Sequence, residues 1–320
     1  MASSAPLRIG VLGCANIARQ FIRDVRPSTA VRIEVVASRD AAKAAAFAAE
    51  TGVGRWHASY EALLADPAVD AVYIPLPNSM HAEWAIAAAQ AGKHVLCEKP
   101  LALGLAEARA MFDAARRHGV MLLEAYPYWF QPQTGDLVAL LAGGAIGEVR
   151  SVQASFGFTV PNPQVNIRMK PDLGGGALLD AGSYTASLIR LAMGEAPLRV
   201  QADANWSAGG PADGVDISLM ATLHFSGGRR AQMACAMDVA NHRRATIMGT
   251  QGTIETEYLN HTSEQAGGHP HGYLPSQMRL RRGVPNSLPF ETIRSATGSG
   301  FRFCAEAFAR VVSARDQTAI

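Results

Sequence analysis

The sequence lacks the features that mark several large classes of protein. It has no run of about 18 consecutive apolar residues, so it predicts no helix that would cross a membrane. Its first residues, MASSAPLRIG, have neither the basic nor the apolar region of a signal peptide. The four cysteines lie far apart, without the spacing of a metal site, a redox motif or a disulfide framework. We therefore expect a reduced, cytoplasmic protein with no membrane partner.

An excess of charge of one sign is also missing. The 29 Lys and Arg residues nearly balance the 27 Asp and Glu residues, and the net charge is +2. A chain with so little net charge has no basic field for nucleic acid and no acidic tail for a basic partner. The hydrophobic content of 48% is that of a soluble globular protein, and 320 residues suit two domains better than one core.

The hydrophobic pattern changes character along the chain. Up to about residue 125, short apolar runs alternate with helical patterns, beginning with LRIGVLG and ANIARQFIRDV. This alternation predicts a parallel, doubly wound α/β sheet. After Gly147 most segments look like strands separated by turn residues, which predicts an open, largely antiparallel sheet. We expect an α/β protein with domains at 1–125 and 126–320, and with residues 260–300 as a long excursion off the second sheet.

The first predicted strand ends in GVLGCANIA. Against the dinucleotide fingerprint G-x-G-x-x-G/A, this stretch offers Gly13, Ala15 and Ala18. Gly13 allows the tight turn, and the helix that begins at Asn16 and Ile17 presents N–H groups to a pyrophosphate. Ala15 places a methyl group where the fingerprint has its second glycine, so a plain strand–turn–helix is the alternative.

The second predicted strand ends in Ala37-Ser38-Arg39-Asp40. NAD enzymes usually place an acidic residue here for the ribose 2′-hydroxyl, whereas an arginine suits a 2′-phosphate. Ser38 and Arg39 therefore favour NADP(H) as the cofactor, with NAD(H) as an alternative. Asp40 stands one place late and is expected to cap the next helix. A solvated loop charge is the alternative role for Arg39.

Pro75, Pro77, Asn78 and His81 follow another buried strand. They stand at its carboxyl end, where open α/β sheets bind their ligands. Pro77 and Asn78 would bring backbone close to the nicotinamide or its ribose. For His81, which lies one turn into a helix, packing or capping is an equal alternative.

Two further stretches carry polar residues in apolar surroundings. Residues 98–100, EKP, follow the strand VLC, and a lysine in such a place is ordinarily a solvated loop charge. LGGGALLDAGSY, residues 173–184, joins three glycines to Asp180 and Tyr184. A helix would place these two side chains on one face. From the spacing alone, a structural hydrogen bond between them is preferred to a catalytic pair.

Taken together, these stretches resemble a known family. GVLGCANIA, YIPLPNSMH, EKP, EAYPYWFQPQ and GGGALLDAGSY occur in the order typical of the glucose–fructose oxidoreductase/inositol dehydrogenase (Gfo/Idh/MocA) family. The resemblance covers residues 7 to about 255 and is nearest to the dimeric dihydrodiol dehydrogenase and aldose dehydrogenase branch. It implies an NADP-binding Rossmann domain followed by a substrate-binding α/β domain. The sheet of the second domain would build a homodimer or a higher homo-oligomer.

The resemblance also implies roles for individual residues. Lys99 corresponds to the active-site lysine beside the nicotinamide, and Glu98 joins the cofactor-binding edge. Asp180 corresponds to the acidic neighbour of this lysine, and Tyr184 to a position held by His or Tyr in relatives. A free tyrosine has a pKa of about 10, and a nearby ammonium group favours its phenolate. We therefore expect Tyr184 as general acid/base, Lys99 as its electrostatic partner and proton relay, and Asp180 as the residue that orients Tyr184 or Lys99. Binding of a substrate hydroxyl is the alternative role for Asp180.

The expected activity is an NADP(H)-dependent hydride transfer at a hydroxyl or carbonyl group of a sugar, polyol or cyclic diol. A trans-dihydrodiol or dicarbonyl reductase specificity is one alternative. A non-catalytic NADP-binding regulator of the same fold is another, although a regulator has no need of a proton donor.

Some positions depart from the family or have no assigned role. Trp129 and Gln131 stand where the branch commonly has Arg and His, and Trp129 is either a flat apolar wall for substrate or a packing residue. Four residues are candidates for the substrate wall but are not assigned to the site: Phe158, Asn162, Arg168 and His242. Three histidines share one predicted loop without carboxylates or cysteines at metal-ligand spacing, and no metal is expected: His261, His269 and His271.

Overall fold

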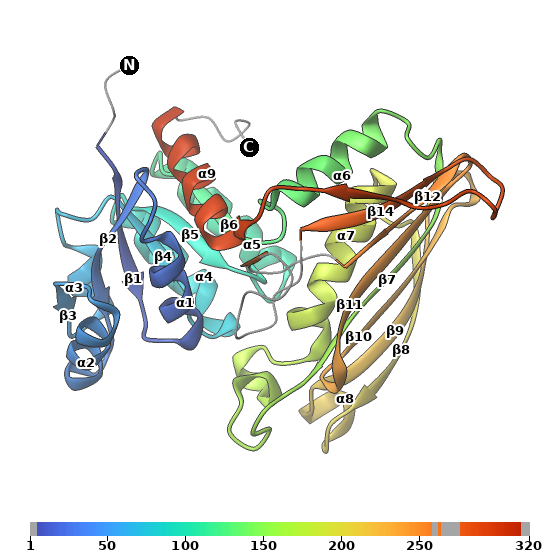
Figure 1. Ribbon diagram of the computed structural model, residues 1–320. Helices are drawn as coiled ribbons and strands as arrows, with labels where there is room; N and C mark the ends of the chain where they lie inside the picture. Colours follow the sequence, from blue (N-terminus) through green and yellow to red (C-terminus); the bar gives the residue numbers. More distant parts are fainter. Residues whose placement is uncertain (1–4, 258–261, 264–275, 315–320) are drawn as a thin grey trace. The chain divides into compact units, whose positions relative to one another are not determined.

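The computed structural model describes residues 5–257, 262–263 and 276–314, and the chain forms two compact units (Figure 1). Unit 1 contains residues 1–130 and 299–320, and unit 2 contains residues 131–298. Unit 1 is built on a parallel sheet and unit 2 on a largely antiparallel one. The predicted α/β fold class is therefore confirmed.

The sheet of unit 1 has six strands in the order β3-β2-β1-β4-β5-β6, and every pairing is parallel. The strand order reverses beside β1, so β1 and β4 flank the position where doubly wound sheets bind ligands. The strands are β1 (Leu7–Leu12), β2 (Val31–Ala37), β3 (Trp56–His57), β4 (Ala71–Ile74), β5 (His94–Glu98) and β6 (Leu122–Ala125).

Helices cover both faces of this sheet because its strands are apolar on both sides. One core joins side chains of α1, α2 and α9 to one face, and a second core joins those of α3, α4 and α5 to the other. The helices are α1 (Asn16–Val25), α2 (Ala41–Thr51), α3 (Tyr60–Leu64), the 3₁₀ turn η1 (Asn78–Met80), α4 (His81–Gln90), α5 (Leu105–Arg117) and α9 (Gly300–Ala314).

The last helix, α9, belongs to unit 1, which differs from the expected division at residue 125. Its Phe301 and Phe308 are completely buried in the core that α1 shares with the sheet. Phe301 also meets Phe21 of α1 edge to face, with ring centroids 6.0 Å apart. The segment from 126 onward is therefore not one body: the chain returns to cover an apolar face that α1 leaves open.

Unit 2 is organised around an eight-stranded sheet in the order β15-β14-β12-β11-β7-β10-β9-β8. Among the described residues of this sheet, β7 and β10 are the one pair of strands that run parallel. Its strands are β7 (Val149–Thr159), β8 (Arg199–Trp206), β9 (Asp216–His224), β10 (Arg230–Ala236), β11 (Asp238–Gly249), β12 (Gly252–Thr256), β14 (Gln277–Arg282) and β15 (Glu291–Arg294). The short strands β13 (Thr262–Ser263) and β16 (Gly298–Ser299) pair separately.

The helices of unit 2 are α6 (Pro132–Ala142), α7 (Ser183–Met193) and α8 (Gly210–Asp213), and α7 packs on β7 and β10. Short helical turns connect the elements: η2 (Ile167–Met169), η3 (Pro171–Leu173), η4 (Leu178–Gly182) and η5 (Ser226–Gly228).

The expected excursion at 260–300 is wrong in part. β14 and β15 extend the sheet of unit 2, and Met278 and Leu280 are buried at alternate positions of β14. In QMRLRR the arginines between and after these two residues make the segment look polar in the sequence. Its buried and exposed residues nevertheless alternate as in a strand, so β14 continues the apolar face of the sheet.

Candidate functional site

The carboxyl edge of the parallel sheet collects most of the residues predicted to bind a cofactor. Gly13, Ser38, Pro75 and Lys99 each follow the end of a strand, namely β1, β2, β4 and β5. These strands are adjacent and parallel, so their carboxyl ends lie along one edge. The fold therefore brings together four segments that are far apart in the sequence (Figure 1).

The turn between β1 and α1 has the geometry that the glycine predicts. Gly13 has φ +108°, and a Cβ there would lie 2.8 Å from Leu76 Cδ2, so only glycine fits without strain. Ala15 packs its methyl group against the core of unit 1. No side chain caps the start of α1, so the N–H groups of Asn16 and Ile17 are available to a ligand.

The end of β2 carries a cation and no free carboxylate. Asp40 caps α2 by accepting a hydrogen bond of 3.0 Å from Lys43 N, as predicted. Ser38 is buried, and its hydroxyl oxygen accepts the Asp40 N–H at 3.2 Å. Arg39 is exposed and lies beside the Tyr60 hydroxyl, where its charge partly offsets the burial that raises the pKa of Tyr60.

The segment after β4 differs in detail from its prediction. Asn78 begins the 3₁₀ turn η1 and α4 starts at His81, so His81 is the first residue of the helix instead of lying one turn into it. His81 is completely buried, with Nδ1 2.9 Å from the Pro100 carbonyl and Nε2 2.9 Å from the Leu76 carbonyl. Burial lowers the pKa of His81, and the two carbonyl contacts oppose this. The imidazole contacts the backbone of two loops, at Pro100 and at Leu76. This is the packing role that the sequence left open as an alternative for His81.

Residues 98–100 form a turn at the end of β5, next to buried polar side chains. The Lys99–Pro100 peptide bond is cis. Glu98 is buried, and its Oε1 accepts a 2.6 Å hydrogen bond from Tyr73 Oη. Burial raises the pKa of Glu98 to about 7, although the Tyr73 hydrogen bond and the Lys99 charge act in the opposite direction. Lys99 itself is partly exposed, so the turn carries a cation that solvent can reach, next to the buried carboxyl group of Glu98.

Glu124, on β6, belongs to this group and was missed by the sequence reasoning. Its Oε1 accepts a 2.8 Å hydrogen bond from the Leu101 amide. In the register of β5 and β6, Glu124 is the neighbour of Cys97. The only sequence signal was an acidic residue at the end of an apolar strand, in the family stretch EAYPYWFQPQ.

In unit 2, the three-glycine loop is fastened by an acidic residue from a distant strand. Asp216, at the start of β9, accepts a 2.6 Å hydrogen bond from the Leu178 amide. A methyl group at Gly176, where φ is +114°, would collide with this carboxylate. Gly175 has no room for a side chain either, because it packs on the Arg168 carbonyl. The glycines therefore serve close backbone packing, and Asp216 is a second residue that the sequence did not reveal.

The segment that follows the glycines carries Asp180 and Tyr184. Asp180 lies in a five-residue π-helical turn, and the regular helix α7 begins only at Ser183. Insertions of this kind are frequent at functional sites. Tyr184, only 2% exposed, meets Phe156 edge to face at 5.3 Å.

Asp180 has a cationic partner from another loop. Its Oδ2 accepts a 2.6 Å hydrogen bond from Arg168 Nε, and the Asp180 side chain is 17% exposed. The Arg168 guanidinium also lies over the Phe158 ring, 5.7 Å from its centroid. Arg168 and Phe158 were candidates for a substrate wall, and the structure joins them to Asp180 in one cluster.

The two positions that depart from the family have opposite environments. The Trp129 ring is 41% exposed and stands edge-on to Tyr128 at 6.4 Å. Gln131 is only 2% exposed, and its amide donates a 3.4 Å hydrogen bond to the Gly298 carbonyl. Trp129 therefore has surface to offer to a ligand, whereas Gln131 packs inside unit 2.

Neither a metal site nor a membrane segment is found where the structure can be described. His261, His269 and His271 lie outside the described residues. Within residues 5–257, 262–263 and 276–314, no three His, Cys, Asp or Glu side chains are grouped to hold a metal ion. In the same residues, no helix has the length and apolar character needed to span a bilayer.

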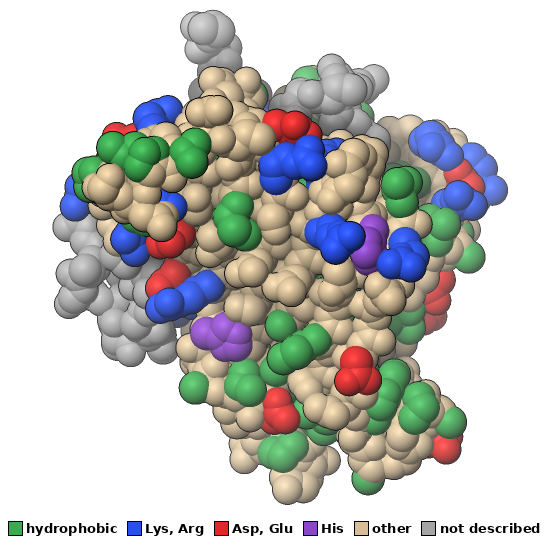
Figure 2. Space-filling view, turned by 90° about the vertical axis from the view of Figure 1, so that its right-hand side faces the viewer, with side chains coloured by type: hydrophobic (Ala, Val, Ile, Leu, Met, Phe, Trp, Pro, Cys, Tyr) green, Lys and Arg blue, Asp and Glu red, His purple; other side chains and the backbone are tan. Residues whose placement is uncertain are grey.

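The sheet of unit 2 has an outer face that none of the described helices covers. A hollow of about 730 Å³ on this face is lined mainly by small and uncharged side chains, among them Gln153, Ser155, Thr222 and Ala234. Figure 2 shows this side of the molecule, with a broad uncharged centre.

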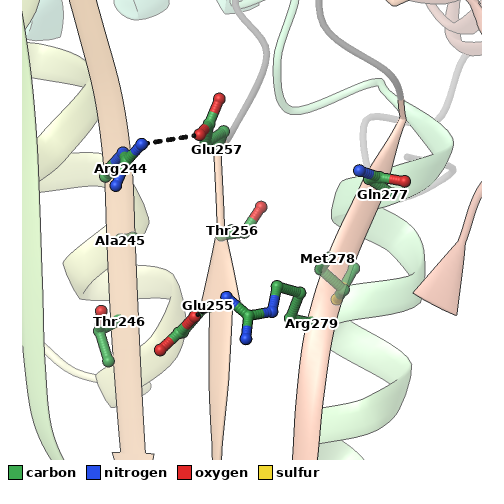
Figure 3. Close-up of a pocket in the computed structure, with 9 residues that line it drawn as sticks. All are labelled: Arg244, Ala245, Thr246, Glu255, Thr256, Glu257, Gln277, Met278 and Arg279. Carbon is green, nitrogen blue, oxygen red and sulfur yellow. Dashed lines mark ion pairs between the residues drawn. The ribbon is translucent and has the colours of Figure 1, made fainter. Parts of the chain in front are cut away.

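A second hollow on the sheet, of about 400 Å³, spans β11, β12 and β14. Ion pairs cross it, from Arg244 to Glu257 at 3.3 Å and from Arg279 to Glu255 at 3.0 Å (Figure 3). Neither hollow contains a residue predicted to take part in chemistry.

Comparison with known proteins gives matches along most of the chain. The model of the Gfo/Idh/MocA oxidoreductase family, NAD-binding Rossmann fold, matches residues 7–126, and that of the Gfo/Idh/MocA C-terminal domain matches residues 136–255. D-xylose 1-dehydrogenase (NADP(+)) 2 of Haloferax volcanii is 39% identical over 249 residues, which are 78% of this chain and 75% of the relative.

Two other proteins are similar over nearly the whole chain. Trans-1,2-dihydrobenzene-1,2-diol dehydrogenase of Danio rerio is 34% identical over 316 residues, with 96% of this chain and 89% of the relative covered. A crystal structure of a 3-ketoreductase from Actinomadura kijaniata, in complex with NADP and TDP-benzene, has a TM-score of 0.81 at 31% identity. The match covers 97% of this chain and 90% of that one.

The buried Glu98 makes stability depend on pH in a defined direction. Its pKa rises from 4.5 to about 7 on folding, so between these values the native state holds a proton that the unfolded chain has lost. The stabilisation by this group is therefore present below about pH 4.5 and is lost as the pH rises through about 7. As the pH rises from about 4.5 to about 7, the free energy of unfolding of Glu98→Gln should increase by roughly 2–4 kcal/mol relative to that of the wild type. Urea unfolding at several pH values measures this difference. The exposed Glu83→Gln is the control, and a pH-independent difference for Glu98→Gln would contradict the raised pKa.

Proposed function

The chain belongs to the Gfo/Idh/MocA oxidoreductase family, and from this we propose that it transfers a hydride between NADP(H) and a hydroxyl or carbonyl carbon of a small sugar, polyol or cyclic diol. One observation carries the proposal. A helix start without a side-chain cap, the exposed Arg39 and the partly exposed Lys99 share the carboxyl edge of one parallel sheet. This is the edge at which such sheets bind nucleotides.

The turn after β1 fits the pyrophosphate of a dinucleotide. Gly13 leaves no side chain at the turn, and the Ala15 methyl group packs into the core. The amides of Asn16 and Ile17 would then hold the phosphates, with the positive end of the α1 dipole behind them. Pro75, Pro77 and the backbone near Asn78 would border the rest of the cofactor, which supplies or accepts the hydride when bound.

The end of β2 favours a 2′-phosphate over a free 2′-hydroxyl. Asp40 is occupied by the first turn of α2, so it does not offer its carboxylate to a ribose. Arg39 presents a guanidinium, which pairs well with phosphate oxygens. The proposed cofactor is therefore NADP(H), in line with the NADP-linked xylose dehydrogenase, and NAD(H) is the alternative.

The proposed chemistry assigns two groups to the reacting oxygen. As hydride reaches the carbonyl carbon, the C=O π bond breaks and its electron pair moves to oxygen, which needs a proton. We assign that proton to the Tyr184 hydroxyl, and its return in the oxidative direction to the same phenolate. The Lys99 ammonium would stabilise the negative charge on either oxygen.

In this proposal Asp180 takes the alternative of its predicted roles, the binding of substrate hydroxyl groups. Because its carboxylate is bound by Arg168 at 2.6 Å, we assign the pair to recognition of substrate hydroxyl groups rather than to orientation of Tyr184. Arg168 donates and Asp180 accepts, so the two together can bind a polyol. Phe158 under the guanidinium adds an apolar surface.

The alternatives within the same fold differ in substrate or in turnover. The exposed ring of Trp129 favours a cyclic diol or a sugar ring over a short acyclic dicarbonyl, because a flat ring can stack on it. A non-catalytic NADP-binding regulator would bind the cofactor equally well but would not need Lys99 or Tyr184.

The outer face of the sheet in unit 2 is the proposed homodimer interface. Small and uncharged side chains, such as Ser155, Thr222 and Ala234, gather at its centre, and few charges would have to be desolvated when two such faces meet. The family resemblance predicts the same surface, and higher oligomers are an alternative.

The cofactor assignment predicts a selective loss in Arg39→Ala. We expect NADPH to bind the wild type at least about tenfold more tightly than NADH, and the variant to lose most of that difference. Tryptophan fluorescence titration with each cofactor measures it, with Lys43→Ala as a neighbouring control. Equal binding of both cofactors by the wild type would remove the NADP preference and leave the dinucleotide site intact.

The catalytic assignment predicts large losses in Lys99→Met and Tyr184→Phe. Each removes a group that acts only as charge develops on oxygen, so kcat should fall by about 10²–10⁴-fold with NADPH binding preserved. NADPH oxidation with a panel of sugars, polyols and diols, read in both directions, supplies the measurement. Near wild-type kcat in both variants would refute the assignment, and tight NADPH binding without turnover by the wild type would favour the regulator.

The dimer assignment predicts that a charge placed in the outer face prevents association. Ala234→Arg should elute with the mass of one chain of 33.9 kDa, whereas the wild type should have twice that mass or more by light scattering. Ala110→Arg, on the exposed side of α5, is the control for added charge. A wild-type monomer, or an unchanged dimer in Ala234→Arg, would exclude this face.

A further inference from the structure

The turn that carries Lys99 is tied to its surroundings at three consecutive residues. The Lys99 amide donates to Glu98 Oε2 at 3.3 Å, the Pro100 carbonyl lies 2.9 Å from His81 Nδ1, and the Leu101 amide donates to Glu124 Oε1 at 2.8 Å. Each partner side chain comes from a different element, β5, α4 and β6.

Glu124 provides the shorter of the two amide contacts. At 2.8 Å its bond has the length of a charge-assisted hydrogen bond, whereas 3.3 Å for Glu98 is long. Glu124 also holds the turn on the side away from β4. The Leu101 side chain packs against the core formed with α3, α4 and α5, so loss of this bond would leave a partly buried amide without its acceptor.

We propose that Glu124 is a positioning residue that fixes the turn bearing Lys99 by binding the Leu101 amide, and so sets where the lysine ammonium stands. The proposal rests on the proposed role of Lys99 in hydride transfer. Glu124 would not touch the reacting groups itself and would act on Lys99 through the backbone of Leu101.

The Glu124 carboxyl group lies among several charged and titratable groups. Burial raises its pKa, while the Leu101 amide and the Lys99 ammonium both favour the ionised form. The other titratable groups nearby are Glu98, Cys97 and, on α9, Cys304. For both thiols burial raises the pKa, so they contribute no negative charge near neutral pH.

Two conservative variants distinguish the effect of side-chain length at position 124 from the effect of its negative charge. Glu124→Asp keeps the negative charge but is one methylene shorter, so its carboxylate falls short of the Leu101 amide. Glu124→Gln keeps a side-chain oxygen at the same reach and loses the charge. Both are polar and similar in size to glutamate, so both are suited to the folded protein.

The first readout needs no activity. Hydrogen exchange of the amides in residues 99–103 of the full chain should be about tenfold faster at Leu101 in Glu124→Asp and near wild type in Glu124→Gln. The opposite pattern, in which Glu124→Gln loses protection and Glu124→Asp keeps it, would overturn the proposal, as would wild-type exchange in both.

The second readout is kcat for NADPH-dependent turnover, because a displacement of about 1 Å can lower a rate by about 10²-fold. We expect kcat to fall by about 10–100-fold in Glu124→Asp and by less than about threefold in Glu124→Gln, with NADPH affinity unchanged in both. In a Lys99→Met background, Glu124→Asp should cause no further loss, since it acts only through the lysine.

The two proposals fail in different ways. A full additional loss of kcat in the Lys99→Met background would mean that Glu124 acts elsewhere, and would overturn the positioning role. Wild-type turnover by Lys99→Met alone would refute the proposed role of the lysine, whereas the exchange experiment would still decide whether Glu124 fixes the turn.

Discussion

The arrangement of the candidate site depends on one constraint: the turn after β5 brings backbone polar groups against an apolar core. A buried amide or carbonyl without a partner costs about 1–3 kcal/mol. Here Glu124 and His81 supply those partners. Their own burial is unfavourable unless they are hydrogen-bonded, so turn and side chains stabilise one another. The result is a fixed backbone that carries a partly exposed cation, Lys99.

Unit 2 meets the same constraint with a different loop. Its three glycines allow the backbone to pack so closely that the Leu178 amide reaches a carboxylate from β9, that of Asp216. In both units a loop that carries predicted catalytic residues is held by an acidic side chain from another strand of the sheet. Such a side chain can hold a loop without contacting substrate, because its hydrogen bond fixes the backbone on which the reactive residue stands.

The sequence predicts well what depends on neighbouring residues. The turn at Gly13, the cap by Asp40 and the two kinds of sheet follow from local periodicity and conformational preference. It does not predict partners that meet only after folding, such as Arg168 with Asp180. For the same reason it does not assign α9 to unit 1, because residues 131–298 separate α9 from the rest of the core that it completes.

The motifs indicate a candidate site but do not say which way each side chain points. The polar residues of EKP, of the segment ending at His81 and of the end of β2 all stand at the same sheet edge. The sequence alone does not distinguish those that point inward from those that reach the surface. The structure separates them: His81 and Glu98 face inward and bind the chain, whereas Lys99 and Arg39 reach the surface. Inward polar groups need partners of fixed geometry, which makes them rigid supports. A motif at such an edge is therefore best divided into residues that hold the backbone and residues that meet the ligand, and only the second kind should control the choice of substrate or cofactor.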